Sequence, residues 1–200
     1  VVLDRTAVFP GGGGQDADCG RLAGVEITGM REEGETIYHI LPSPLDAGSE
    51  IHGEVDWAVR FPRMQGHSGE HIFSGTVHRL FGAENVGFHM GADTMTLDFS
   101  VELSAEDVAL AELEANRAVW RNLPINSLLP SADELEHMAY RSKKELSGQV
   151  RIVEIPGVDM CACCAPHLLH TGEIGAIKVL DFMRHRGGTR PPPGWGGGAH

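Results

Sequence analysis

The chain has 200 residues, of which 42% are hydrophobic, and a formal net charge of −12 at pH 7. This content can bury a sizeable core in one or two domains, whereas the acidic balance argues against broad, non-specific binding to nucleic acid. A run of about 18 apolar residues and a charged-then-apolar leader are both missing, so we expect a cytoplasmic protein without a membrane span.

Residues 1–56 show short apolar runs that alternate with polar residues and are separated by turns. Val25 with Ile27, residues 37–40, and Ile51 with Val55 are strand-sized segments of this kind. We therefore predict a small N-terminal β-barrel domain over residues 1–56.

Four consecutive glycines occupy positions 11–14 of this domain. Glycine tolerates backbone conformations and close approaches that other residues do not, so this loop could lie against a ligand. A flexible surface loop is the alternative. The GxxxxGK[ST] pattern is missing, so the segment is not a phosphate-binding loop of that type.

Residues 61–81 carry apolar side chains at helical intervals, which predicts a buried helix. This stretch contains His67 and His71, four residues apart. On a helix, two such side chains project from the same face and can bind one metal ion. Two imidazoles that are simply buried in the helix packing are the alternative.

The rest of the chain mixes strands and helices. Periodicity, caps and turns predict a hairpin of strands over 86–90 and 95–99 with its turn at 91–93, helices over 104–122 and 132–140, and strands over 150–155 and 176–180. Without a regular βαβ repeat, this pattern indicates an α+β fold with an antiparallel sheet packed by helices. We assign residues 57–188 to a second domain and expect the low-complexity residues 189–200 to be a disordered tail.

Three of the four cysteines lie within residues 161–164. Such close neighbours are poorly placed to form disulfides with one another, whereas reduced thiols suit metal binding. Cys163 and His167 repeat the four-residue spacing of His67 and His71. If the fold brings the two pairs together, they supply four ligands for one zinc ion; inert buried thiols are the alternative.

Two other zinc chemistries compete with this interpretation. Residues 67–71 match the inverted zincin pattern HxxEH, in which Glu70 would be the general base of a peptidase, but that interpretation leaves Cys163 and His167 without a role. The zinc deaminase signature does not fit, because the spacing of its histidine, glutamate and cysteines differs. A zinc ion with four protein ligands is usually structural, whereas hydrolysis needs an open position, and the sequence leaves this choice open.

Three separated motifs resemble those of the AlaX-type alanyl-tRNA editing proteins. This family comprises free-standing relatives of the editing domain of alanyl-tRNA synthetase and is also related to the second additional domain of threonyl-tRNA synthetase. Its HxxxH and CxxxH zinc motifs are both present, and the Thr-Gly-Glu-Ile-Gly run that follows the second stands at residues 171–175. The family's Pro-x-Gly-Gly-Gly-Gln-x-x-Asp-x-Gly motif matches residues 10–20.

The resemblance implies a trans-editing hydrolase that removes serine or glycine from mischarged tRNA(Ala) at a zinc site. The zinc ligands that it implies are His67 and His71, which would also support catalysis, together with Cys163 and His167. The residues that we expect to bind the aminoacyl end are Gln15 and Asp18 of the glycine-rich motif, and His89 and Asp98 of the predicted hairpin. A catalytically weak or inactive zinc- and tRNA-binding module is the alternative.

Two features depart from the family pattern or bear on RNA binding. The family usually has a Gly-Thr pair before its last ligand, where this chain has Ala165 and Pro166, and proline removes a backbone donor and fixes φ. The candidates for basic surface patches are Arg141 with Lys143, Lys144 and Arg151, and Arg184 with Arg186 and Arg190. An ordinary solvated face is the alternative for both patches.

Overall fold

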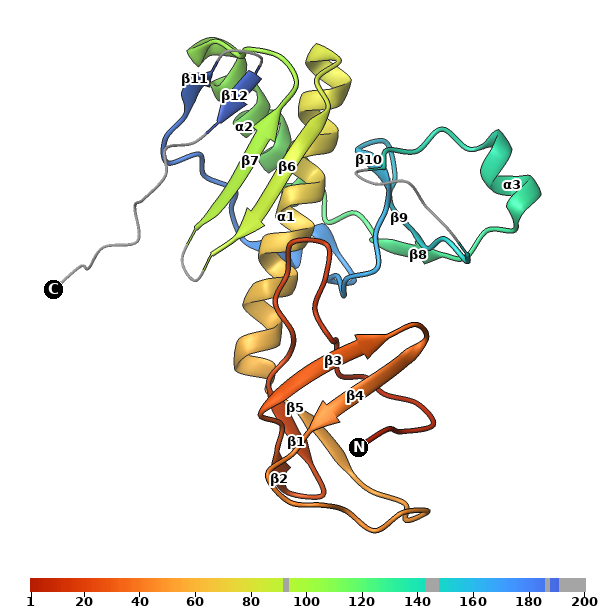
Figure 1. Ribbon diagram of the computed structural model, residues 1–200. Coiled ribbons are helices and arrows are strands. Elements are labelled where there is room, and N and C mark those ends of the chain that lie inside the picture. Colours follow the sequence, from red (N-terminus) through yellow and green to blue (C-terminus); the bar gives the residue numbers. More distant parts are fainter. Residues whose placement is uncertain (92–93, 143–147, 186–187, 191–200) are drawn as a thin grey trace, which may run out of the picture.

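The computed structural model describes residues 1–91, 94–142, 148–185 and 188–190 (Figure 1). Part of the predicted hairpin turn, Lys143, Lys144, Arg186 and residues 191–200 of the predicted tail lie outside the described residues. The helices of the described chain are α1 (Trp57–Phe81), α2 (Ala105–Trp120) and α3 (Ala132–His137), with a single 3₁₀ turn, η1 (Thr171–Ile174). None of these helices is long and apolar enough to cross a bilayer.

Five short strands form the N-terminal region. They are β1 (Gly20–Leu22), β2 (Val25–Glu26), β3 (Gly29–Glu33), β4 (Thr36–Ile40) and β5 (Gly53–Val55). Strands β2, β1 and β5 make one antiparallel sheet, and β3 and β4 make a separate hairpin. The closed barrel expected from the sequence is therefore not formed. The strands have only two to five residues, and a long irregular connection separates β4 from β5. Too few residues are therefore paired between strands to close a barrel.

Helix α1 is the central element of the structure (Figure 1). Its first turn is capped by Asp56, whose carboxylate accepts hydrogen bonds from the N–H groups of Ala58 and Val59, and its end is marked by Gly82 in the left-handed conformation. The cap explains why the helix begins four residues before the predicted start at Phe61. Twelve of its residues between Met64 and Val77 are buried, which places both histidines of the HxxxH motif in the interior.

The remaining strands form two sheets beside α1. One has the order β11 (Met183–His185), β12 (Gly188–Arg190), β7 (Met95–Phe99), β6 (Asn85–Met90), and the other has the order β10 (Asp159–Ala162), β9 (Ile152–Ile155), β8 (Asn126–Leu128). The pairings are antiparallel, as the α+β prediction required. Strand β12 runs across the domain end proposed at residue 188.

The strand predicted over residues 176–180 is wrong. These residues are irregular, and their polar groups bond to side chains of α2 instead of to a neighbouring strand. Asn116 Oδ1 accepts from the Ile177 N–H, and Glu112 accepts from the Val179 N–H. Because side chains accept the backbone hydrogen bonds of this segment, it does not need to pair with a neighbouring strand despite its apolar alternation.

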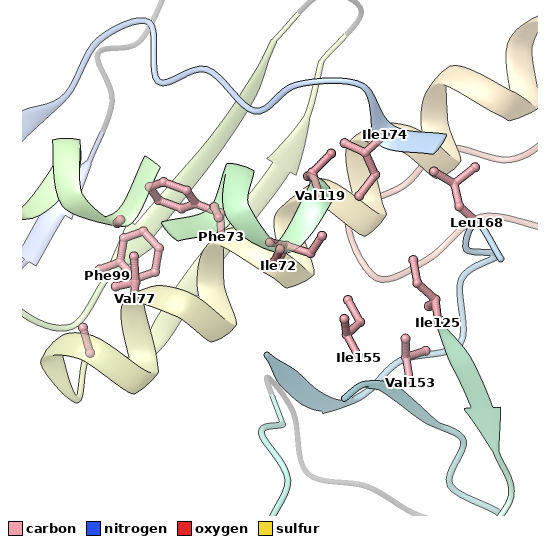
Figure 2. Close-up of a cluster of buried hydrophobic side chains, with 14 of the residues drawn as sticks. Ile72, Phe73, Val77, Phe99, Val119, Ile125, Val153, Ile155, Leu168 and Ile174 are labelled. Atoms are coloured by element: carbon pink, nitrogen blue, oxygen red, sulfur yellow. The ribbon is translucent and has the colours of Figure 1, made fainter. Parts of the chain in front are cut away.

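The hydrophobic core is built around α1 (Figure 2). Ile72, Phe73 and Val77 of α1 pack with residues of α2, β7 and β9 and with the loops that follow β10. A separate small cluster of Val8, Leu22 and Ile27 supports the N-terminal strands. The larger core thus fixes α1 against the segment that carries the late cysteine motif.

Candidate metal centre

The two metal-binding motifs meet in space. His67 and His71, on consecutive turns of α1, and Cys163 and His167, just after β10, have ligand atoms that all lie within 4.8 Å of one another. Both α1 histidines are 1% exposed. Segments about a hundred residues apart in sequence therefore present three imidazoles and one thiol to a single point.

The distances inside this cluster fit a tetrahedral zinc ion. Cys163 Sγ lies 3.6 Å from His67 Nε2 and 3.4 Å from His167 Nε2. Zinc bonds of about 2.3 Å to sulfur and about 2.0–2.1 Å to nitrogen place the two atoms about 3.5 Å apart in a tetrahedron. The donor set is also one that zinc prefers.

The other nitrogen of each imidazole has a partner that orients the ring. His67 Nδ1 lies 2.9 Å from Gln15 Oε1, and His71 Nδ1 lies 3.0 Å from Asp159 Oδ2. Both oxygens only accept, so Nδ1 carries the proton in each ring and Nε2 offers its lone pair to the cluster. His167 Nδ1 lies 3.1 Å from Ser68 Oγ.

Asp159 is itself held by a buried arginine. Arg141 donates from Nε to Oδ1 at 2.8 Å and from Nη2 to Oδ2 at 2.9 Å, which is a bidentate pair. Gly75 lets α1 approach this carboxylate, because a Cβ there would lie 2.6 Å from the Asp159 Cβ. A chain of contacts thus runs from Arg141 through Asp159 to His71.

Electrostatics at the cluster favour positive charge. Burial disfavours a charged imidazole, but the hydrogen bond to Asp159 and the neighbouring Cys163 and Glu70 raise the pKa of His71 to about 9. Burial opposes the thiolate, but hydrogen bonds from His167, His67 and His71 lower the pKa of Cys163 to about 2. Burial lowers the pKa of His167 to about 4, so this ring is neutral at pH 7. The thiolate of Cys163 and the neutral ring of His167 are the forms that bind a metal, and a metal ion bound here would displace the Nε2 proton of His71.

The glycine-rich loop before β1 rises along α1 to this cluster (Figure 1). A Cβ added to Gly13 would lie 3.9 Å from His67 Cε1, and one added to Gly14 would lie 2.4 Å from Phe88 Cδ1. Gly14 has a φ of +86°, a conformation that side chains rarely adopt. The close contacts therefore require glycine at position 14 and place Gln15 against His67.

Two arginines of α1 hold this loop in place. The Arg60 guanidinium pairs with both carboxylate oxygens of Asp18, whose Oδ2 also accepts from the Phe9 N–H at 2.6 Å. Arg63 donates to the Ala17 carbonyl at 2.6 Å. Asp18, expected to bind substrate, is thus engaged by the protein itself.

The residues predicted on the hairpin do not reach the cluster. Phe88 of β6 faces His67, with ring centroids 5.1 Å apart, so the next residue, His89, points to the other face of the sheet. His89 is exposed there. Asp98 pairs with Gly87 across the hairpin and shares that far face.

Glu70, the general base of the peptidase interpretation, is held by the protein through one carboxylate oxygen. Its side chain is fully buried, and its Oε1 accepts hydrogen bonds from Ser74 Oγ and Asn85 Nδ2, both at 2.7 Å. Its Oε2 lies 3.9 Å from His71 Nε2. The peptidase interpretation still leaves Cys163 and His167, which complete the cluster, without a role.

The two arginines of the first predicted basic patch are engaged within the protein, and its two lysines lie outside the described residues. Arg141 is buried on Asp159, and Arg151 donates to the Cys164 and Ala165 carbonyls, both at 2.8 Å. These two arginines support the cluster, and Arg151 fixes the turn that contains Pro166.

The sequence prediction missed Ser68 and Asp159 as residues that support the cluster, and it placed Arg141 and Arg151 in a surface patch. Nothing in the local pattern of Ser68 or Asp159 distinguishes them, because each acts on a residue far away in the chain.

Comparison with known proteins finds one matching family model and several relatives of this chain. A family model described as the threonyl and alanyl tRNA synthetase second additional domain matches residues 150–190. The alanyl-tRNA editing protein AlaX-M of Methanosarcina acetivorans is 35% identical over 94% of this chain and 84% of its own length.

Two longer relatives are similar over most of this chain. Aarsd1 of Mus musculus is 33% identical over 90% of the chain and 45% of its own length, and AlaX-L of Pyrococcus horikoshii is 33% identical over 92% and 48%. Both are named alanyl-tRNA editing proteins. The chain spans slightly less than half the length of these relatives.

Proposed function

Because the chain belongs to the AlaX and Aarsd1 family of alanyl-tRNA editing proteins, we propose that it is an aminoacyl-tRNA hydrolase acting in the cytoplasm. Its substrates are tRNA(Ala) molecules mischarged with serine or glycine, which it deacylates in trans. The convergence of the HxxxH and CxxxH motifs on one point carries this proposal.

The need for such an activity has a physical basis. A pocket shaped for alanine cannot strongly exclude glycine, which is smaller, or serine, which adds one hydroxyl, because such differences are worth roughly 1–3 kcal/mol. A second site that hydrogen-bonds the serine hydroxyl can reject alanine much more strongly, since alanine leaves a buried polar group unpaired.

His67, His71, Cys163 and His167 are the proposed zinc ligands. Zinc, when bound there, supplies a positive charge that orients the aminoacyl end or lowers the pKa of a bound water to about 7. Gln15 and Asp159 keep the Nδ1 protons of His67 and His71 in place, so that the Nε2 atoms face the ion.

Gln15 has a further role in the proposal. Its Oε1 accepts the hydrogen bond from His67 Nδ1. Its buried Nε2 has no hydrogen-bond partner among the described residues. A buried amide donor without a partner is costly, so it is suited to an acceptor brought by a ligand. We assign Nε2 to the hydroxyl of the seryl group. Asp18 positions the loop through Arg60, and we assign no role to His89 or Asp98.

One assay tests the hydrolase. Purified protein is incubated with Ser-tRNA(Ala), Gly-tRNA(Ala) and Ala-tRNA(Ala), and the released amino acid is measured. Release of serine or glycine but not of alanine supports the proposal. No release from a zinc-loaded protein would identify an inactive zinc-binding module instead.

Paired cysteine variants test the ligand set. Cys163→Ala is expected to lose zinc and activity. Cys164→Ala is the matched control, because this neighbouring thiol is exposed and lies outside the cluster. Full zinc occupancy in Cys163→Ala would refute the assignment.

A further inference from the structure

A polar hollow lies between α1 and α2, and none of its lining residues belongs to the metal cluster. Its volume is about 220 Å³, and its lining residues are Thr76, Arg79, Glu114, Arg117, Ala118, Arg121, Gly157 and Val158. The floor is made of the small buried residues Thr76 and Ala118, and the exposed rim carries three arginines. We call this feature the arginine hollow. It is smaller than the roughly 300–1,000 Å³ typical of pockets for drug-sized molecules.

The arginine hollow has surplus positive charge. Glu114 lies 2.5 Å from Arg117 and 4.0 Å from Arg79, and it is the single carboxylate of the lining. Arg121 has no ion-pair partner within the described ranges. Three guanidinium groups against one carboxylate leave a local charge of +2 on a chain of net charge −12.

Helix dipoles explain part of this arrangement but not all of it. Arg79 and Arg117 lie in the last turns of α1 and α2, where a basic side chain is favourable. That effect acts on each helix separately. It does not require the ends of two helices to bring their arginines to one concave surface.

The arginine hollow lies near the metal cluster. Arg79 is eight residues after His71 on α1, which corresponds to about 12 Å along the axis at 1.5 Å per residue. On the other wall, Val158 immediately precedes Asp159, the carboxylate that orients His71. A single strand of nucleic acid with a rise of about 3.4 Å per residue covers this distance in a few nucleotides.

An exposed aromatic side chain, Trp120, lies between two lining arginines of the hollow in sequence. Trp120 is 68% exposed, and it is three residues after Arg117 and next to Arg121. Side chains three apart on a helix are neighbours on its surface. Arginines interleaved with an exposed aromatic ring are the usual elements of a surface that contacts phosphates and stacks on bases.

We propose that the arginine hollow and Trp120 form the surface that docks the sugar–phosphate backbone of the tRNA acceptor arm. This inference rests on the proposed function, because it assumes that the aminoacyl end enters the metal cluster. Arg79 and Arg121 contact phosphates on the rim, and Arg117 remains partly neutralised by Glu114. The site explains how an acidic protein holds RNA through a small basic surface.

The test compares two double variants of the full chain. Arg79→Gln with Arg121→Gln removes two charges from the arginine hollow, and Arg21→Gln with Arg31→Gln removes two from exposed N-terminal strands. Binding of uncharged tRNA(Ala) is measured across a range of salt concentrations. We expect the first variant to reduce the slope of log K against log salt by about two, and the control to leave it unchanged.

Two further measurements complete the test. Arg79→Lys with Arg121→Lys is expected to retain most of the salt slope, because lysine keeps the charge. In steady-state deacylation, the glutamine variant should raise KM at least about tenfold with little change in kcat and in zinc content. Unchanged slope and KM in the glutamine variant would overturn the docking surface while leaving the hydrolase intact. Reduced tRNA binding together with a wild-type protein that releases no amino acid would support the surface and refute the hydrolase.

Discussion

At the scale of single residues, spacing predicted the four residues that converge in the cluster but not the residues that orient them. A four-residue interval places two histidines on one face of a helix, so the HxxxH motif can be interpreted from local geometry. Gln15, Ser68 and Asp159 orient the rings across separations of 52, 99 and 88 residues. Such contacts depend on the folded chain, and no local pattern contains them.

Gln15 provides the first prediction at this scale. Gln15→Met removes the Nε2 donor, together with the Oε1 acceptor of the His67 Nδ1 proton, while keeping a side chain of similar length. We expect kcat/KM for Ser-tRNA(Ala) to fall about 10- to 100-fold, corresponding to the roughly 1–3 kcal/mol cost of a lost buried hydrogen bond.

Glycine offers no hydroxyl, so the rate on Gly-tRNA(Ala) should fall less in Gln15→Met. Gln149→Met, the same change on the surface, is the control. Equal losses for serine and glycine would contradict the assignment of Nε2.

Arg141 gives a prediction about stability. Arg141→Leu leaves the Asp159 carboxylate buried without its bidentate partner. We expect about 3–5 kcal/mol less free energy of unfolding and about 10- to 100-fold weaker zinc binding. Denaturant titration and chelator competition measure these quantities, and Arg21→Leu is an exposed control. An unchanged denaturation midpoint would contradict the buried pair.

At the scale of elements, capped helices were predicted best and short strands worst. Ser104 begins α2 with a capping box, a signal contained within four residues. Strand β8 has three residues, and its place in a sheet depends on β9, which follows 24 residues later. The apolar alternation over residues 176–180 led to a wrong strand prediction for the same reason. Only the folded structure shows that side chains of α2 accept hydrogen bonds from the backbone of this segment.

The glycine-rich loop allows a sharp test. Gly14→Ala would place a Cβ 2.4 Å from the Phe88 ring, in a strained conformation, so the loop must move away from His67. We expect a large loss of deacylation with nearly normal zinc content. Gly34→Ala is the matched control, since Gly34 also has a positive φ but has open space around it. Wild-type activity in Gly14→Ala would show that the loop does not act at the site.

The contact between α2 and the segment after η1 depends on pH. Burial opposes ionisation of Glu112, but hydrogen bonds from Lys178 and from the Val179 N–H lower the pKa of this carboxyl. A lowered pKa in the folded state stabilises the fold above the unfolded-state value of about 4.3, and this contribution is lost as pH falls through the folded value.

We therefore expect Glu112→Gln to cost about 1 kcal/mol at pH 7 and progressively less as pH falls below about 4. Chemical denaturation in EDTA at several pH values measures this difference. Glu35→Gln, on an exposed turn, is the control and should show no such pH dependence. A difference that stays constant with pH would contradict the role of the ionised carboxylate.

At the scale of the whole molecule, the α+β class could be predicted because helical and alternating patterns occur without a βαβ repeat. The barrel could not, because closure depends on the pairing of strand edges and not on the number of strands. The N-terminal region instead joins the rest of the molecule through the Asp18–Arg60 pair and the Gln15–His67 contact.

Metal removal should affect the whole fold. The proposed zinc ion links α1 to the loop after β10, so chelation is expected to lower the thermal midpoint. At a free zinc concentration about 1,000 times Kd, the lost stabilisation is about 4 kcal/mol. Cys163→Ala should no longer respond to the chelator. A wild-type midpoint that is insensitive to EDTA would contradict a zinc site that stabilises the fold.

The distance in sequence between the two halves of the cluster has a consequence for synthesis on the ribosome. His67 and Cys163 are 96 residues apart, and His167 follows still later. A nascent polypeptide therefore carries His67 without the thiolate while the next 96 residues are added. The order of synthesis itself delays completion of the proposed zinc site until Cys163 and His167 have emerged.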